Sequence, residues 1–203
     1  MTKAAEMSSG SSATRRQILD AALETLRNEG FAGATSRAIA RAGGFNQALI
    51  FYHFGTLDGL LLAALDHTSE ERLERYRDAI ARAESVDELA AAVARLYAED
   101  RERGHMTVVA QMVAGSAARA DLKPALVARM EPWLALCEQA IEKALRWLGL
   151  PELVPRRELA YAFVTFYLGV NLMTQLDEDR ARTDALFERL EALAPLLAPL
   201  AVK

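Results

Sequence analysis

The stretch Thr35–Phe54, T-S-R-A-I-A-R-A-G-G-F-N-Q-A-L-I-F-Y-H-F, predicts two short helices joined by a tight turn. Thr35 can cap the first helix, and Ile39 lies four residues later, on the face that would turn inward. Gly43 and Gly44 end that helix, because a tight turn needs a positive-φ backbone conformation that glycine adopts readily. A helix-turn-helix of this kind places its second helix in the major groove of DNA.

The start of the second helix is also specified locally. Asn46 is a favourable N-cap, and Phe45 before it and Ile50 after it occupy the two positions of a hydrophobic staple. Ile50 and Phe54 are four residues apart and share the face that packs inward. The other side chains of this helix are therefore expected to be available for contacts outside the domain: Gln47, Ala48, Leu49, Phe51, Tyr52 and His53.

The chemistry of these side chains suits DNA. Gln47 can pair with an adenine edge, and Ala48 and Leu49 can contact thymine methyl groups. Tyr52 and His53 are better suited to phosphate oxygens, which position a protein without reading sequence. The alternative is an ordinary helix corner inside a protein core. Such a corner has no need to present a glutamine, two aromatic residues and a histidine around so short a helix, so DNA binding is the preferred interpretation.

Residues from Thr14 to about Leu62 resemble the N-terminal DNA-binding domain of TetR-family transcriptional regulators. The likeness is carried by A-x-x-x-L-x-x-x-G-F-x-x-A-T at Ala22–Thr35 and by N-Q-A-L-I-F-Y-H-F-G-T-L-D-G-L at Asn46–Leu60. The resemblance implies a three-helix DNA-binding domain with a helix-turn-helix, followed by a helical ligand-binding and dimerisation domain. It further implies a homodimeric repressor that a small-molecule effector releases from a palindromic operator on double-stranded DNA.

By position, the resemblance implies that Thr35, Ser36 and Arg37 approach the DNA backbone or the groove edge. The full set of DNA-contacting candidates is Thr35, Ser36, Arg37, Asn46, Gln47, Ala48, Leu49, Phe51, Tyr52 and His53. One position departs from the family pattern. Where relatives usually carry a phosphate-binding lysine at the start of the fourth helix, this chain has Leu57 followed by Asp58. Arg15, Arg16 and Arg37 are then expected to supply more of the phosphate contact.

Composition agrees with this interpretation. The 203 residues carry a net charge of −4, yet residues 1–55 hold six Lys and Arg against four Asp and Glu, so the basic excess lies with the predicted DNA-binding segment. Cys137 is the only cysteine, which excludes an intrachain disulfide and fits a reducing cytoplasm. Residues 1–12 lack the apolar run of a secretory signal and are expected to form a flexible tail.

The chain as a whole predicts an all-α fold of about nine helices, because no alternating strand pattern of useful length occurs. We expect the tail at 1–12, the helix-turn-helix domain at 13–55 and the effector-binding and dimerisation domain at 56–203. Thr14 with Gln17 forms a capping box for the first helix, which Gly30 should stop. A long helix at about 56–83 should join the two domains, with its charged part, Ser69–Arg82, exposed to solvent.

Later helices are predicted at 85–104, 106–119, 121–148, 159–176 and 182–197. Ser85 with Glu88 is a second capping box. Pro132 should kink the helix that contains it and so open space for a ligand.

Residues 159–176 contain no charged side chain over 18 positions, which raises a transmembrane alternative. Thr165, Asn171, Thr174 and Gln175 would then lie in hydrocarbon with no second span to receive their polar groups. We therefore expect no membrane span. A helix buried both against its own domain and against a second subunit explains the pattern better, and together with the leucines at 186, 190, 193 and 197 it would form a four-helix dimer interface.

An all-helical enzyme is the alternative class of function. The sequence contains no nucleophile-elbow, phosphate-loop or zinc-protease motif. His53, His67 and His105 are isolated from other metal ligands, and Asp177–Asp179 fits a solvated loop better than a cation site. No catalytic residue, metal or cofactor is therefore predicted. A purely protein-binding scaffold would leave the first 55 residues unexplained, and sequence-selective DNA binding distinguishes the regulator from both alternatives.

The effector site is the least determined feature. Small-molecule sites are mostly apolar with a few polar anchors, and the side chains of this kind in the second domain are Tyr97, His105, Met106, Met112, Trp133, Cys137, Phe163, Phe166, Tyr167 and Asn171. For any one of them, ordinary core packing or a place in the dimer interface is favoured over a role in the effector site. Nothing in the sequence selects among drug-like, fatty-acyl, flavonoid or antibiotic-precursor ligands.

Overall fold

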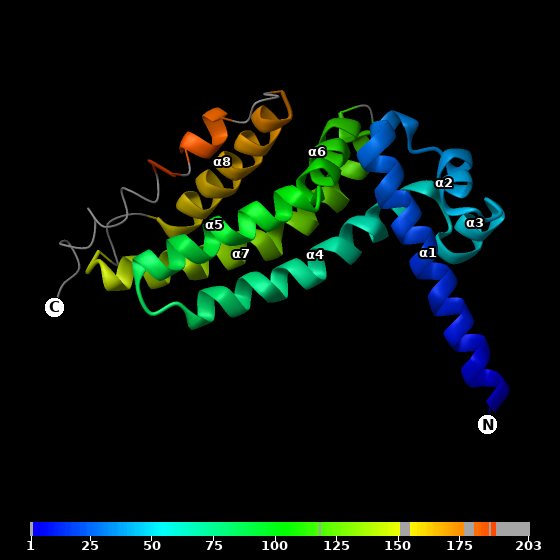
Figure 1. The fold of residues 1–203 in the computed structure, drawn as a ribbon, viewed down its shortest axis with the longest axis horizontal. Helices are drawn as coiled ribbons and strands as arrows, with labels where there is room; N and C mark the ends of the chain where they lie inside the picture. Colours follow the sequence, from blue (N-terminus) through cyan, green and yellow to red (C-terminus); the bar gives the residue numbers. More distant parts are fainter. Residues whose placement is uncertain (1, 118, 151–154, 177–180, 187, 190–203) are drawn as a thin grey trace. The chain divides into compact units, whose positions relative to one another are not determined.

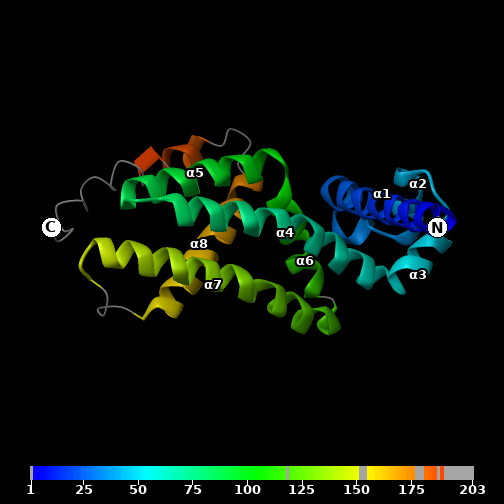
Figure 2. The same ribbon diagram turned by 90° about the horizontal axis from the view of Figure 1, so that it is seen from below.

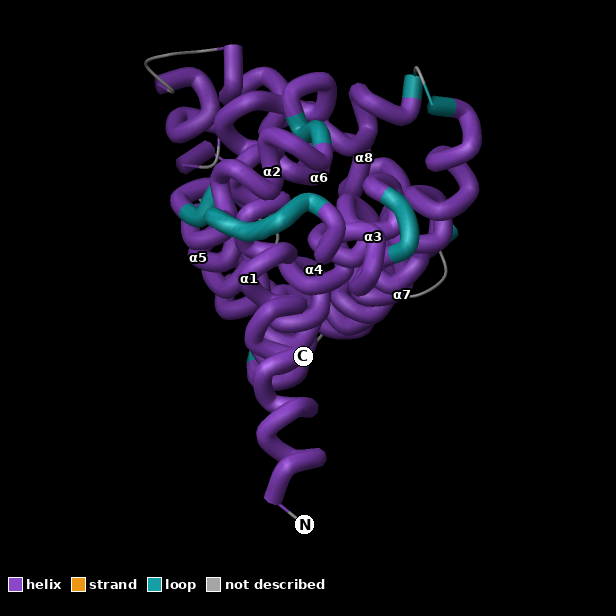
Figure 3. The backbone as a smooth tube through the Cα atoms, turned by 90° about the vertical axis from the view of Figure 1, so that its right-hand side faces the viewer, coloured by secondary structure: helices purple, strands orange, loops and turns teal. Residues whose placement is uncertain are grey.

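The computed structural model describes residues 2–117, 119–150, 155–176, 181–186 and 188–189. Over this part of the chain the regular structure is helical throughout, as predicted (Figures 1 and 3). In chain order the elements are α1 (Thr2–Gly33), α2 (Ser36–Gly43), α3 (Ala48–Phe54), α4 (Leu57–Arg82), α5 (Val86–Glu102), α6 (His105–Ser116), the short 3-10 helix η1 (Ala120–Leu122), α7 (Lys123–Trp147) and α8 (Arg156–Leu176).

The helices form two compact units. We call Met1–Glu70 with Thr107–Val127 the N-terminal unit, and Glu71–Met106 with Ala128–Lys203 the C-terminal unit. The boundary therefore falls within α4, α6 and α7 rather than at residue 56, where the sequence analysis placed it. The first turns of α4 and most of α6 pack with the three predicted DNA-binding helices, because they supply apolar side chains that those short helices need to complete a core.

The core of the N-terminal unit forms around α1. Ile18 and Leu26 of α1 are fully buried together with Ile39 of α2, Ile50 of α3 and Leu60 of α4. Val108 and Met112 of α6 complete this cluster. Ile39 of α2 and Ile50 of α3 are buried, as the apolar spacing predicted. The cluster fixes the two helices of the predicted helix-turn-helix on α1.

The first helix differs from its prediction at both ends. It begins at Thr2, so residues 2–12, expected to be a flexible tail, are helical, in keeping with the strong helix formers Ala4, Ala5 and Glu6. Gly30 interrupts the helix as expected, with φ 71° and ψ −179°, but one further turn continues to Gly33. The amide that the interruption leaves unpaired, Phe31 N–H, donates to Gln111 Oε1 of α6 at 3.0 Å.

In the C-terminal unit, α5 and α7 lie along the second part of α4, and α8 lies beyond them (Figures 1 and 2). Leu73, Tyr76 and Ile80 of α4 are buried there with Leu96 of α5 and Leu136 of α7. The prediction that Ser69–Arg82 is solvated is therefore wrong for one face of this segment. Its apolar residues recur at helical spacing between the charged ones, and that stripe packs inward.

The remaining helices follow their predictions closely. Glu88 N–H donates to Ser85 Oγ at 3.1 Å, and the Glu88 carboxylate accepts from the backbone N–H of Glu84 at 2.8 Å, so the predicted capping pair starts α5. Pro132 lies inside α7, which is continuous across it. Of the predicted last helix, residues 181–186 and 188–189 are helical. Leu190, Leu193 and Leu197 lie outside the described residues, as does the acidic run at 177–179.

Within the described part of the chain, none of the helices taken singly has both the length and the apolar character needed to cross a bilayer. The pair α3 and α4 meets the criteria of length and composition only when taken together, and it is bent by 67°.

Candidate functional site

The α2–turn–α3 segment has the local geometry that its sequence predicts. Thr35 caps α2, because its hydroxyl accepts a hydrogen bond from the N–H of Ala38 at 3.2 Å. Gly44 ends the helix in the left-handed conformation, with φ 67°, and its N–H bonds back to the last turn. The predicted positive-φ position is thus Gly44 alone, whereas Gly43 is still helical.

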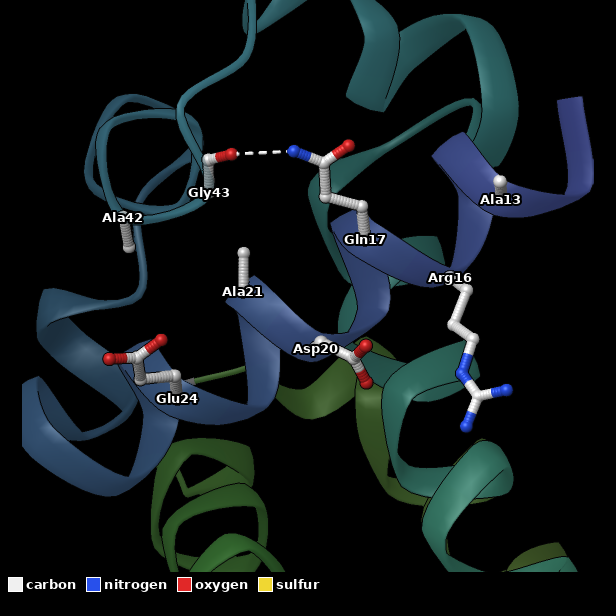
Figure 4. A pocket seen from close by; sticks show the side chains of 8 residues that line it. All are labelled: Ala13, Arg16, Gln17, Asp20, Ala21, Glu24, Ala42 and Gly43. Carbon is white, nitrogen blue, oxygen red and sulfur yellow. Dashed lines mark hydrogen bonds between the residues drawn. The ribbon is translucent and has the colours of Figure 1, made fainter. Parts of the chain in front are cut away.

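Gly43 has a packing role instead. A Cβ atom at this position would lie 2.2 Å from the ring of Phe45 and 2.8 Å from Cβ of Ala21 on α1. The Gly43 carbonyl also accepts a hydrogen bond from the amide of Gln17 at 2.8 Å, which joins the end of α2 to α1 (Figure 4). The absence of a side chain therefore lets α2 approach α1 closely enough for this bond.

Asn46 sets the start of α3. Its side-chain oxygen accepts from the N–H of Ala48 at 2.9 Å, and Gln47 already has helical φ and ψ values of −54° and −24°. Asn46 is thus the functional N-cap, as predicted, although the regular hydrogen-bond pattern begins at Ala48. Phe45 and Ile50, the predicted staple, both pack into the core of the N-terminal unit.

The outward face of α3 is formed by four side chains. Gln47 and Ala48 are exposed, Phe51 is 48% exposed and Tyr52 is 80% exposed. Leu49 differs from the expectation, because it is half-buried and packs against the core. A seven-residue helix that rests on a core needs more than Ile50 and Phe54 to cover its inner side, and Leu49 supplies the additional contact.

Aromatic and basic side chains flank this face. His53 is half-buried and packs edge-on against Tyr52, with the ring centroids 4.9 Å apart. The guanidinium of Arg15 lies over the Phe54 ring, 5.1 Å from its centroid. Arg37 of α2 is exposed. The end of α3 therefore has a cation from α1 beside its aromatic residues, an arrangement suited to phosphate contact.

The other predicted contact positions lie at the helix starts. Thr35 is exposed, with its hydroxyl engaged in the cap, and Ser36 is half-buried. At the start of α4, Leu57 packs against the core, and Asp58 forms an ion pair with Arg119. At the position where the sequence resemblance implies a lysine, leucine thus adds apolar packing, and the neighbouring carboxylate is neutralised by a residue from the same unit.

A shallow groove of about 430 Å³ lies between α1 and α2 (Figure 4). Its lining combines small residues with charged side chains of both signs. The lining residues are Ala13, Arg16, Gln17, Asp20, Ala21, Glu24, Ala42 and Gly43. None of them belongs to the predicted effector set.

Several predicted effector residues meet around a buried ion pair in the C-terminal unit. Asp100 of α5 is fully buried and accepts two hydrogen bonds from the guanidinium of Arg72, at 2.9 and 2.6 Å. Tyr76 donates to the same carboxylate at 3.0 Å, and His105 Nδ1 lies 3.2 Å from its other oxygen. The Tyr167 hydroxyl of α8 donates to the oxygen that Arg72 and Tyr76 contact, at 3.4 Å. Four helices thus contribute to this group, which we call the Asp100 cluster.

The electrostatics of the cluster follow from these contacts. Burial by itself would raise the pKa of Asp100, but hydrogen bonds from His105 and Arg72 and the charge of Arg72 outweigh it and lower this pKa to about 2. Burial raises the pKa of Tyr76 and of Tyr167 above the ordinary tyrosine value. The cluster therefore contains a charged carboxylate and neutral phenols at physiological pH.

Aromatic rings enclose this charge. The Arg72 guanidinium lies over the Trp133 ring at 4.7 Å, Trp133 packs edge-on against Tyr76, and Tyr97 packs edge-on against Tyr167. Met106 is buried and its sulfur is 3.4 Å from Arg72. The predicted residues that converge here are Tyr97, His105, Met106, Trp133 and Tyr167.

Sequence reasoning missed the polar centre of the cluster, namely Arg72, Tyr76 and Asp100. Arg72 and Tyr76 are four residues apart, and that spacing within a charged stretch was the available signal.

The other predicted effector residues lie elsewhere. Met112 is fully buried in the core of the N-terminal unit, and Asn171 donates to the Tyr167 carbonyl within α8. Cys137 is half-buried, and burial raises the pKa of its thiol to about 11. Phe163 and Phe166 are exposed.

The exposed side of α8 is apolar. Large hydrophobic residues are exposed along it, while Ala160 and Val170 are among its buried residues. The exposed residues are Tyr161, Phe163, Phe166, Leu172 and Met173. We call these five residues the α8 face. Among the described residues, no group of three or more potential metal ligands occurs.

Comparison with known proteins shows what part of the chain is similar to them. Residues 18–64 match the profile of "Bacterial regulatory proteins, tetR family". The chain is 35% identical over 79 residues to the HTH-type transcriptional regulator BetI of Brucella anthropi. That match covers 39% of this chain and 41% of the relative, so the chain aligns with less than half the length of the curated protein.

Solved structures share the fold over most of the chain. The transcriptional regulator FadR of Bacillus subtilis, solved in complex with stearoyl-CoA, has a TM-score of 0.75 at 14% identity and covers 88% of this chain and 96% of its own. A transcriptional regulator of Saccharomonospora viridis, solved in complex with choline, has a TM-score of 0.74 at 19% identity and covers 90% of this chain and 95% of its own. These likenesses show the fold.

Proposed function

We propose that this chain, a transcriptional regulator whose residues 18–64 place it in the tetR family, is a repressor that binds a palindromic DNA operator as a homodimer and is released by a small-molecule effector. The observation that carries the proposal is the outward face of α3, with Gln47, Ala48, Phe51 and Tyr52 exposed on a helix that α1 and α2 hold firmly in place. An enzyme is not favoured, because the matched family is one of regulators.

DNA binding would proceed by insertion of α3 into the major groove. Gln47 can form two hydrogen bonds to an adenine edge, whereas Tyr52, His53 and Arg15 suit the phosphates on either side. A homodimer would place a second α3 about 34–36 Å away, one turn of the duplex, and so read a palindrome. The α8 face supports the dimer, since an exposed apolar surface of this kind is typical of an isologous interface.

Effector response is proposed for the C-terminal unit. Five of the predicted effector residues lie in or around the Asp100 cluster, and two members of the cluster, Arg72 and Tyr76, lie on α4. The first turns of α4 belong to the N-terminal unit. A ligand that rearranges this cluster would favour a different conformer, and it lowers operator affinity only by its differential affinity for the two conformers. Such a regulator would act in the cytoplasm, on DNA.

Two related structures indicate the range of effectors to test. One relative was solved with stearoyl-CoA and another with choline. Each can be titrated into an operator complex of this protein. Release by one of them at concentrations that leave the fold intact would identify the effector class.

The direct test of the proposed function is selection of duplexes from a random pool. We expect the wild-type protein to enrich one palindromic sequence, because α3 presents base-reading side chains. A matched Gln47→Ala, Tyr52→Ala double variant should remain folded, since both side chains are exposed, and should enrich nothing. Recovery of an unenriched pool by folded wild-type protein would contradict the proposal.

A further inference from the structure

Phe51 is a large apolar side chain on the outward face of α3, and folding of the chain does not account for its exposure. Nearly half of it, 48%, is open to solvent. The neighbouring Leu49 and Phe54 pack against the core of the N-terminal unit, whereas Phe51 does not belong to that set. Ala48 and Tyr52 are exposed beside it, and an exposed group of apolar and aromatic side chains is the kind of feature that marks a contact surface.

The neighbours of Phe51 restrict what it can contact. Gln47 and Ala48 precede it by four and three residues, so helix geometry places all three side chains on one face. Both neighbours are exposed. Ala48 and Phe51 offer only carbon atoms, which neither bind phosphate nor pair with the polar edges of bases. In the major groove the matching carbon group is the 5-methyl of thymine, which apolar side chains contact.

We infer that Phe51 reads the 5-methyl group of a thymine within about two base pairs of the base that Gln47 contacts, because side chains four residues apart on a helix stand about 5–6 Å apart. Ala48, one turn before, is short and leaves Phe51 room to reach this methyl. This inference rests on the proposed function, since it requires that α3 enters the major groove.

The inference assigns two kinds of recognition to one short helix. Gln47 supplies polar discrimination by hydrogen bonds, and Phe51 supplies apolar discrimination that depends on a single methyl group. A site read in this way is sensitive to the loss of a methyl even when every hydrogen-bonding group of the base pair is retained. Deoxyuridine differs from thymidine by that methyl alone and is therefore the appropriate probe.

The experiment is a scan of the selected operator in which each thymine, together with its symmetry mate, is replaced by deoxyuridine. Wild-type protein should lose about threefold to fivefold in affinity per half-site at one thymine position, the effect of exposing one methyl group. Phe51→Ala should bind the thymine operator more weakly and show no further loss at that position. Phe51→Leu, which keeps an apolar side chain, should retain part of the sensitivity. Tyr52→Phe should retain all of it.

The outcomes separate the inference from the function on which it rests. If wild-type protein binds its operator and no deoxyuridine position weakens binding, or if Phe51→Ala and wild type lose affinity equally at every position, the inference is wrong while the proposed function stands. If folded wild-type protein selects no sequence at all, both are wrong. Circular dichroism melting of each variant checks that the lost affinity reflects contact rather than unfolding.

Discussion

Gln47 is the exposed residue for which the proposed role in DNA recognition is most specific. It lies in the first turn of α3 beyond the Asn46 cap, and its amide can form two hydrogen bonds to one base. Tyr52 is more exposed but has a single hydroxyl better suited to phosphate. Substitution of a base-reading residue and of a backbone-positioning residue should therefore change the affinities for cognate and scrambled DNA differently.

Replacement of Gln47 by alanine should weaken binding to the cognate operator by about 1–3 kcal/mol and relax preference at one base pair per half-site. Tyr52→Phe is the matched control, and it should weaken cognate and scrambled duplexes alike. Fluorescence anisotropy titrations on both duplexes measure the two effects. Equal losses on cognate and scrambled DNA for Gln47→Ala would remove its assigned role.

The second prediction at the scale of one residue concerns the contribution of Asp100 to the pH dependence of stability. Its pKa of about 2 lies below its ordinary value of 3.8, because the hydrogen bonds from His105 and Arg72 and the Arg72 charge outweigh the effect of burial. A carboxylate whose pKa is lower in the folded chain stabilises the fold above its unfolded pKa, and that contribution is lost as the pH falls through the folded value.

We therefore expect the free energy of unfolding to fall by about 2 kcal/mol on this account between about pH 4 and pH 2. Urea denaturation over this range measures it. Asp100→Asn should lack this component, whereas Asp78→Asn, in an exposed pair with Arg82, should keep the wild-type dependence. An Asp100→Asn variant with the wild-type pH dependence would show that the cluster does not hold the charged carboxylate.

At the scale of the element, the close approach of α2 to α1 depends on Gly43. A Cβ there would collide with Phe45 and Ala21, whereas a Cβ at Gly44 would meet nothing within 4 Å but would need a backbone with φ 67°. The two adjacent glycines therefore serve different purposes, one for space and one for conformation.

Alanine substitution separates the two purposes. Gly43→Ala should destabilise the fold by about 1–3 kcal/mol through overpacking, and it should weaken operator binding because α2 and α3 must shift. Gly44→Ala should cost about 1 kcal/mol in conformational strain and leave the helix packing unchanged. Thermal melts and operator titrations compare the pair. A Gly43→Ala protein as stable as the wild type would contradict the packing account.

The helices that the sequence predicted best are those whose starts are determined locally. The caps at Thr35, Asn46 and Ser85 form bonds to groups within three residues, so a single window of sequence contains both partners. The same holds for the buried spacing of Ile39 and Ile50. These features were sufficient to predict the helix-turn-helix and the outward face of α3, with Leu49 the exception because its burial depends on how a short helix rests on the core.

Features set by distant contacts could not be predicted in this way. Arg72 is buried because Asp100, 28 residues away in sequence, accepts its hydrogen bonds. Most of α6 belongs to the N-terminal unit, where Gln111 binds an amide of Phe31 that is 80 residues away. Neither pairing leaves a periodic signal in the sequence. The charged appearance of Ser69–Arg82 was therefore a misleading guide to packing.

At the scale of the whole molecule, the proposed function requires two copies of the chain. On the α8 face, Tyr161 is 65% exposed and Met173 is 57% exposed. Exposed apolar surface of this extent favours association with a second copy. Substitution of Met173 by glutamate should break the dimer, because an isologous contact brings each introduced charge close to its symmetry mate. DNA binding should be lost with it.

Sedimentation velocity and operator titration together measure this coupling. Ala91→Glu on the exposed side of α5 is the matched control and should leave both the dimer and DNA binding unchanged. A folded Met173→Glu protein that remains dimeric and binds the operator would show that the subunits associate through another surface.

The central claim is that a dimer of this chain reads a palindrome by placing one α3 helix in each of two successive major grooves. The most direct test measures affinity for the selected operator and for the same operator with five base pairs inserted at its centre, which turns one half-site to the opposite side of the duplex. The account predicts that the insertion reduces affinity to the level of a scrambled duplex, because two half-sites must lie about 10–10.5 base pairs apart on one face. Equal affinity for the operator with and without the insertion would contradict it.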